Sequence, residues 1–262
     1  MKWSHVLLTV ALSNGVLAQP SGSIEGKRRA LIFLCRENLA QQFTPGYKAA
    51  ITNYWVGTRP DLDMSQGRVV NTNIPLHLAI LGEGFFCLKE GHYTRDGRMT
   101  LKNDLILGPS DEPLLAYKLD AEGNITQNVD VIRFPMDPEN KLYLGKYNEC
   151  TFDAQGYFLG GITETDPVTG YTHTGYSPLY RLAIATFPQP QRLEREKGTL
   201  LSANRESGAA SLDMPGQHRI GFLVPSSVEM SNVDPVQQAY IWGRLDATEM
   251  RPLPKPPGQK KK

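Results

Sequence analysis

The sequence predicts a mainly β protein with α-helical termini, in which an antiparallel β body is flanked by short N- and C-terminal helices that come together. Between about residues 47 and 224, short runs of β-branched and aromatic residues are separated by Gly, Asp, Asn and Pro, which is typical of many short antiparallel strands. Apolar residues recur at helical spacing near the two ends of this stretch. Each of these helices must bury its apolar face against another surface, so we expect them to pair with each other or with neighbouring subunits.

The first eighteen residues have the features of a secretory signal peptide. Lys2 precedes an apolar run from Val6 to Leu12, and the segment ends in Val16-Leu17-Ala18, whose small residues suit a signal peptidase. The apolar run is too short to cross a hydrocarbon core of ~30 Å as a permanent helix. We therefore expect cleavage after Ala18 and a mature chain without a transmembrane segment. The alternative is an ordinary amphipathic N-terminal helix.

Residues 19–73 are predicted to form an N-terminal helix followed by an extended segment. The helix is expected over residues 30–42, where Leu31, Leu34, Cys35 and Leu39 form one apolar stripe. Thr44-Pro45-Gly46 should end it, because proline lacks a backbone donor and glycine accepts the left-handed geometry of an exit turn.

Residues 74–188 are predicted to form the β-rich body. Alternation of apolar residues predicts half-buried strands at residues 76–80 and 180–184. Turn residues predict hairpins at Asp96-Gly97, at Glu122-Gly123-Asn124 and at Ala154-Gln155-Gly156.

Residues 189–251 form the C-terminal segment, which is predicted to end in a helix. Asp234 is suited to cap this helix and Pro235 to occupy its first position. Val236, Ala239, Tyr240, Gly243 and Ala247 then form one stripe, with Ile241 and Leu245 beside it, until Pro252 ends the helix. Residues 252–262 contain four prolines and four lysines, so we expect a disordered tail.

Composition and motifs give no support for catalysis or for nucleic-acid binding. The 28 basic and 27 acidic residues leave a net charge of +1, which gives no general positive electrostatic field to attract a polyanion such as a nucleic acid. The five histidines include no pair with helical metal-ligand spacing, and no nucleophile elbow, phosphate loop or dinucleotide fingerprint is present. We therefore expect a protein that is not an enzyme and that takes no cofactor, metal or small-molecule substrate.

Two smaller features leave alternatives open. Cys87 and Cys150 could form a disulfide in an oxidising compartment. The odd count of three, with Cys35, equally suits cysteines that act as small buried apolar residues, and this is the interpretation we favour. Asn124-Ile125-Thr126 matches the sequon for N-linked glycosylation, which matters only in a host that glycosylates such sites.

Three stretches of the sequence resemble the bacterial flagellar basal-body rod and hook protein family, most closely its distal rod branch. They are Asn38-Leu39-Ala40 with the turn TPGYK at residues 44–48, the stretch LHLAILGEGFFCLKEGHYTRDG at residues 76–97, and residues 182–238, which include VEMSNVDPVQQ. The residues that carry the match are Asn38, Pro45, Gly46, Tyr47, Gly82, Gly84, Phe85, Phe86, Ser231, Asn232 and Val233.

The resemblance implies a structural subunit of the flagellar basal body, located in the periplasm and acting in cell motility. In that family the terminal helices form a coiled-coil-like inner layer of a helical tube, and the β body faces outward. It further implies that the chain associates with itself and with other rod, hook or ring subunits. The expected interface residues are Leu31, Leu34, Leu39, Val236, Tyr240 and Ile241. The resemblance also implies that Gly82 and Gly84 serve strand and turn geometry beside buried Phe85 and Phe86, and that Asn232 caps or orients the final helix.

The chain is expected to be a divergent member, because family members are normally exported by the flagellar type III apparatus without a cleaved signal. The alternative is a secreted or periplasmic β-rich binding or adhesion module derived from the same fold. A hydrolase with a dispersed site has no supporting motif.

Overall fold

The protein is mainly antiparallel β with two helices in the part of the chain that the structure describes. The computed structural model describes residues 24–51, 60–120, 122–134, 147, 149–218 and 220–247. The predicted signal peptide and the predicted C-terminal tail lie outside these residues. No helix within the described ranges is both long and apolar enough to cross a membrane.

The elements follow one another along the chain as one helix, a long series of strands and a second helix. The helices are α1 (Ile24–Ala40) and α2 (Pro235–Ala247), and two 3₁₀ turns lie at Pro109–Asp111 and Pro190–Arg192. The strands are β1 (Ala50–Ile51), β2 (Asp61–Leu62), β3 (Val69–Asn71), β4 (Leu78–Leu81), β5 (Phe85–Cys87), β6 (His92–Thr94), β7 (Thr100–Lys102), β8 (Leu105–Leu107), β9 (Leu115–Leu119), β10 (Ile125–Val131), β11 (Glu149–Phe152), β12 (Tyr157–Thr165), β13 (Thr172–Leu182), β14 (Ile184–Thr186), β15 (Glu194–Lys197), β16 (Leu200–Ser202), β17 (Ser211–Asp213), β18 (Phe222–Pro225) and β19 (Ser227–Glu229).

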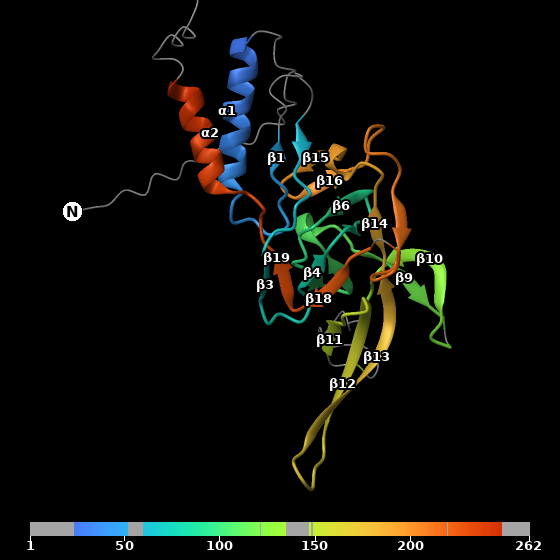
Figure 1. Cartoon of the computed structure of the whole chain (residues 1–262). Helices are drawn as coiled ribbons and strands as arrows, with labels where there is room; N and C mark the ends of the chain where they lie inside the picture. Colours follow the sequence, from blue (N-terminus) through green and yellow to red (C-terminus); the bar gives the residue numbers. More distant parts are fainter. Residues whose placement is uncertain are drawn as a thin grey trace, which may run out of the picture.

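The two helices lie side by side and antiparallel, at one end of the β body (Figure 1). Arg28 donates from Nε to the Leu245 carbonyl at 2.8 Å, and the Arg36 guanidinium lies 5.1 Å from the centre of the Trp242 ring. The expectation that the terminal helices come together is therefore confirmed. The N-terminal helix begins six residues earlier than the sequence predicts, at Ile24, because its first turns carry charged residues that give no apolar stripe.

Two larger sheets form most of the β body. One has five strands in the order β10-β9-β13-β12-β11, and the other has six in the order β15-β16-β6-β5-β14-β17. Four two-stranded ladders accompany them, β1-β2, β3-β19, β4-β18 and β7-β8, and each of these strand pairs is antiparallel. The ladders β4-β18 and β3-β19 join the stretch that follows the N-terminal helix to the stretch that precedes α2.

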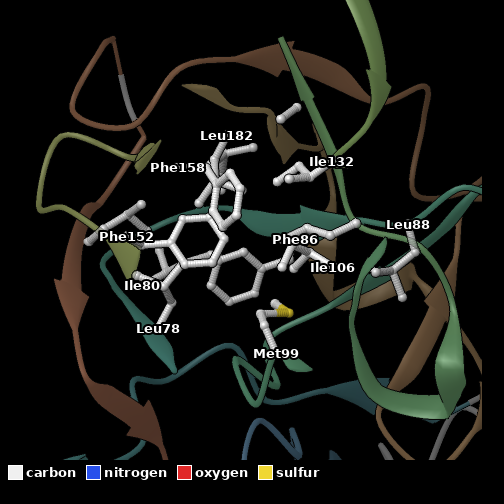
Figure 2. Close-up of a cluster of buried hydrophobic side chains, with 14 of the residues drawn as sticks. Leu78, Ile80, Phe86, Leu88, Met99, Ile106, Ile132, Phe152, Phe158 and Leu182 are labelled. Carbon is white, nitrogen blue, oxygen red and sulfur yellow. The ribbon is translucent and has the colours of Figure 1, made fainter. Parts of the chain in front are cut away.

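The main core lies between these sheets and consists of aromatic and branched aliphatic side chains. Phe86, Phe152 and Phe158 meet at its centre, among Leu78, Ile80, Leu182 and Met99 (Figure 2). The rings of Phe152 and Phe158 lie 5.2 Å apart.

The two strands predicted by alternation differ from the half-buried strands expected. In β4, Ala79 is as fully buried as Leu78 and Ile80, because both faces of this strand are covered. The predicted strand at residues 180–184 is the end of β13 and the start of β14, which belong to different sheets. Alternation of apolar and polar residues indicates a strand that is buried on one face only. It therefore gives the wrong burial for a strand in which small alanines allow packing on both faces.

Two of the three predicted hairpins are confirmed, and one is wrong. Glu122-Gly123-Asn124 joins β9 to β10, and Ala154-Gln155-Gly156 joins β11 to β12. Asp96-Gly97 does not form a hairpin, since β6 pairs with β5 and β16 and not with β7. This turn instead packs on β4, where the Gly97 carbonyl accepts the Leu78 N–H at 2.9 Å.

The three cysteines are free thiols. Cys35 and Cys87 are buried and Cys150 is half-buried, which agrees with the interpretation as small apolar residues. Burial raises the pKa of the Cys87 thiol from about 9 to about 12.

Candidate functional site

The motifs that carry the family resemblance meet where the helices join the β body. We call this buried polar network the junction and define it by Asn38, Tyr47, Lys48, Arg95, Glu229 and Asn232. Its members come from α1, from the turn after α1, from the loop after β6, from the end of β19 and from the segment before α2. Each of these residues lies in one of the motifs named above, but the motifs indicate no role for Lys48, Arg95 or Glu229.

The Glu229 carboxylate is the centre of the junction and is 1% exposed. Its Oε1 accepts hydrogen bonds from Lys48 Nζ at 2.6 Å and from the Gly67 N–H at 2.8 Å. Its Oε2 accepts one from Arg95 Nε at 2.7 Å. One carboxylate therefore ties together the turn after α1, the segment before β3 and the loop after β6.

Arg95 uses the rest of its guanidinium to hold the segment between β4 and β5. Its Nη1 donates to the Gly82 carbonyl at 2.8 Å and to the Gly84 carbonyl at 2.7 Å, and its Nη2 donates to the Ile80 carbonyl at 2.9 Å. Gly82 and Gly84 both have positive φ, which brings their carbonyls toward this one cation. The expectation that these glycines serve turn geometry beside buried Phe85 and Phe86 is confirmed.

The junction buries two cations against one carboxylate, a net charge of +1. Backbone carbonyls offset the excess charge, including that of Ser65, which accepts from Lys48 Nζ at 2.7 Å. Burial lowers the pKa of the Lys48 ammonium, while the nearby Glu229 carboxylate acts in the opposite direction. These charges are buried and paired, an arrangement that fixes structure and does not expose a reactive group to solvent.

Asn38 fastens α1 to both the β body and α2. Its Oδ1 accepts the Ala50 N–H at 2.9 Å and its Nδ2 donates to the Ala50 carbonyl at 2.9 Å, so the side chain pairs with β1 as a strand would. The same Nδ2 donates to Gln238 Oε1 on α2 at 3.2 Å, and Tyr47 Oη donates to Asn38 Oδ1 at 3.2 Å. This one side chain therefore joins α1, which carries it, to β1 of the β body and to α2.

Asn232 has a different role from the one the resemblance suggests. We expected it to cap or orient α2, but its Oδ1 accepts the Ala49 N–H at 2.7 Å and its Nδ2 donates to the Asp63 carbonyl at 2.8 Å. The cap is Asp234, whose Oδ1 accepts the N–H groups of Val236 and Gln237 at 2.9 and 3.0 Å. Asn232 instead joins the chain before α2 to the segments on either side of the β1–β2 ladder.

Pro45, Gly46 and Tyr47 form the turn that leads from α1 into the junction. Gly46 has a φ of +70°, and a Cβ there would lie 2.1 Å from the Asp96 backbone nitrogen, so only glycine fits. Its N–H donates to the Glu229 carbonyl at 2.7 Å. Tyr47 is 3% exposed and packs with Ala49 and Val233.

Arg195 of β15 lies over the Tyr47 ring. Its guanidinium carbon lies 4.0 Å from the ring centre, and it also donates to the Lys48 carbonyl. Burial lowers the pKa of Arg195. Arg195 could not be predicted from the sequence, because an arginine in a strand of alternating charges has no local feature that indicates a buried partner.

The six residues predicted to form an assembly interface fall into two groups. Leu34 is buried, and Leu31, Leu39 and Ile241 are half-buried within the helical pair. Val236 and Tyr240 of α2 are 77% and 62% exposed. The face of α2 that packs inward is a neighbouring stripe, formed by Gln238, Ile241, Trp242 and Leu245.

The described part of the chain holds no group of three His, Cys, Asp or Glu side chains placed to bind a metal ion. Ser231, the remaining motif residue, accepts the Val233 N–H at 3.3 Å from its own loop. The chemistry of the junction is therefore that of hydrogen bonds and buried ion pairs between distant segments.

The chain is similar to the flagellar basal-body rod protein FlgG of Buchnera aphidicola subsp. Baizongia pistaciae. The two are 27% identical over 191 residues, which cover 68% of this chain and 60% of the length of that relative. No protein-family model matches the sequence.

Proposed function

We propose that this protein is a structural subunit of the bacterial flagellar basal body, of the rod or hook type. It acts in motility by self-association and by contacts with other rod, hook or ring subunits, and it is not an enzyme. The observation that carries the proposal is the junction, in which three segments that resemble the rod and hook family hold both helices against the β body. The similarity to a flagellar basal-body rod protein supports the same role.

The helical pair supplies the assembly surface in this proposal. Val236 and Tyr240 lie four residues apart on the face of α2 that the protein itself leaves exposed. Phe33 of α1 and Phe43 in the following turn are also exposed, at 46% and 78%. Covering side chains of this size contributes about 1.5–3 kcal/mol each, so a neighbouring subunit would stabilise the assembly by burying them. Leu31, Leu34, Leu39 and Ile241 would then support the pair from within.

The test is incorporation into basal bodies purified from the host. We expect Val236→Glu with Tyr240→Glu to lower incorporation at least tenfold, because both charges would have to be buried in the assembly. Gln237→Glu is the matched control, since this exposed residue lies on the same helix between them. The thermal unfolding midpoint of the purified double variant should equal that of the wild type. Unchanged incorporation of the double variant would show that this face of α2 is not part of the assembly interface.

Delivery to the periplasm by the general secretory route is part of the proposal. The basis is the sequence of residues 1–18, and the test is N-terminal sequencing of the protein from the host. A mature chain that starts at Gln19 supports this route, and an intact Met1 contradicts it.

The second candidate function is a secreted or periplasmic binding or adhesion module. The hairpin β12–β13 favours it: its strands extend well beyond their neighbours in the sheet and form a long projection from the body (Figure 1). Val168 and Tyr171 at its end are 91% and 70% exposed. Absence of the protein from purified basal bodies, together with its presence in the periplasm, would favour this function over the first.

A further inference from the structure

The hairpin β9–β10 carries the acceptor sequon for N-linked glycosylation. Asn124-Ile125-Thr126 is the only Asn-x-Ser/Thr triplet in the sequence, so a modification of this kind has one possible position. Triplets of this type arise often by chance. The place of the triplet in the fold therefore decides whether a transferase can use it.

The triplet begins in an exposed turn. Glu122, Gly123 and Asn124 are exposed, and a Cβ built on Gly123 meets no atom within 4 Å. The strand that follows, β10, lies at an edge of the five-stranded sheet, away from the helices (Figure 1). A large enzyme can therefore approach Asn124 without contact with the core or with the helical pair.

The triplet runs into an irregular part of its own hairpin. Ile125 pairs with Leu119, but the next paired residues are Val129 and Tyr117, so the register is irregular between them. In this irregular stretch Thr126 Oγ1 donates to the Lys118 carbonyl at 2.8 Å. Opening the turn breaks the hydrogen bonds that close it, most of which involve Asp120, but it exposes none of the main core, so the motion stays local to this hairpin.

One hydrogen bond restrains the amide that would react. Asn124 Nδ2 donates to Asp120 Oδ2 at 3.2 Å, while Asp120 Oδ1 accepts the Asn124 N–H at 2.7 Å. The Asn124 side chain is therefore held beside its own turn until that turn opens.

We propose that Asn124 is an acceptor for N-linked glycosylation, with an oligosaccharide linked to a lipid pyrophosphate as the donor. The Asn124 amide nitrogen forms a bond to C1 of the first sugar and gives up one proton to a base of the transferase. The bond between C1 and the pyrophosphate oxygen breaks, and its electron pair leaves with the lipid pyrophosphate. In the cell this reaction rests on the proposed delivery across the membrane, because the transferase acts on exported chains.

The experiment uses the purified, folded full chain with a purified bacterial oligosaccharyltransferase and its lipid-linked oligosaccharide. Intact-mass spectrometry should show the gain of one oligosaccharide, and peptide mapping should place it on Asn124. Asn124→Gln and Thr126→Val should abolish the gain, and Thr126→Ser should retain it. Asn128→Gln is the matched control, since this exposed asparagine of β10 lies outside the triplet, and it should retain the gain.

A further variant tests the restraint on the amide. Asp120→Ala removes the acceptor of Asn124 Nδ2, so the initial rate of modification should rise at least twofold. No mass gain in the folded wild-type chain, or a gain that persists in Asn124→Gln, would overturn the proposal. The reaction uses purified components, so its result is separate from that of the export and basal-body experiments.

Discussion

Replacement of Glu229 by Gln is the sharpest test of the junction. Glutamine keeps the size of the side chain but removes its charge, which leaves Lys48 and Arg95 as two cations that are 3% and 4% exposed. Its NH₂ group also faces donors where the carboxylate accepted three hydrogen bonds. Breaking a buried ion pair by removal of one partner costs about 3–5 kcal/mol. In a chain of this length, that corresponds to a fall of roughly 6–20 °C in Tm.

Urea unfolding at pH 7, followed by circular dichroism, measures this free energy. Glu206→Gln is the control, because the Glu206 side chain is 63% exposed and lies 3.7 Å from Arg192, so it should cost under about 1 kcal/mol. Lys48→Met leaves Arg95 and Glu229 as a neutral pair, and it should cost less than Glu229→Gln. A cost for Glu229→Gln no greater than that of Glu206→Gln would refute the electrostatic account, as would a larger cost for Lys48→Met.

Two further predictions concern a glycine and a thiol. In urea unfolding, Gly46→Ala should destabilise the protein by more than Gly123→Ala. Both positions have positive φ, which costs a residue with a side chain about 1–2 kcal/mol, but only at Gly46 does the new Cβ meet backbone, at 2.1 Å. Equal losses of unfolding free energy in the two variants would contradict this reasoning. Burial raises the pKa of the Cys87 thiol to about 12, so as pH rises the thiol ionises in the unfolded chain before it ionises in the folded protein. The free energy of unfolding should therefore fall as pH rises above 9, by about 1.4 kcal/mol at pH 10. Cys87→Ala should flatten the dependence of unfolding free energy on pH by that amount between pH 8 and 10, and a slope equal to that of the wild type would rule out this assignment.

The features that the sequence predicted correctly are those set by neighbours along the chain. The cap at Asp234 and the first position at Pro235 depend on residues within one helical turn, and α2 begins at Pro235. The two confirmed hairpins are closed by Gly123 and Gly156, which both have positive φ. Each of these signals can be evaluated without knowledge of what packs against the segment.

The features that it missed depend on distant partners. A turn such as Asp96-Gly97 shows that the chain changes direction, but it does not show which strand lies beside it, and here β6 pairs with β5 and β16. Asn232 is close to α2 in sequence, which suggested a cap, yet its amide bonds to backbone near residue 63. A polar side chain that serves a remote backbone group looks the same in sequence as one that serves its own helix.

The orientation of α2 shows why the candidate interface could be predicted only in part. Its apolar residues form two neighbouring stripes, one through Val236 and Tyr240 and one through Ile241 and Leu245, and periodicity alone does not choose between them. In the structure the stripe through Ile241 and Leu245 is the half-buried one, and on the same side Gln238 accepts a buried hydrogen bond from Asn38 of α1. A buried polar contact of this kind contributes orientation more than stability. With α2 in this rotation Val236 and Tyr240 are exposed, as the proposed assembly surface requires.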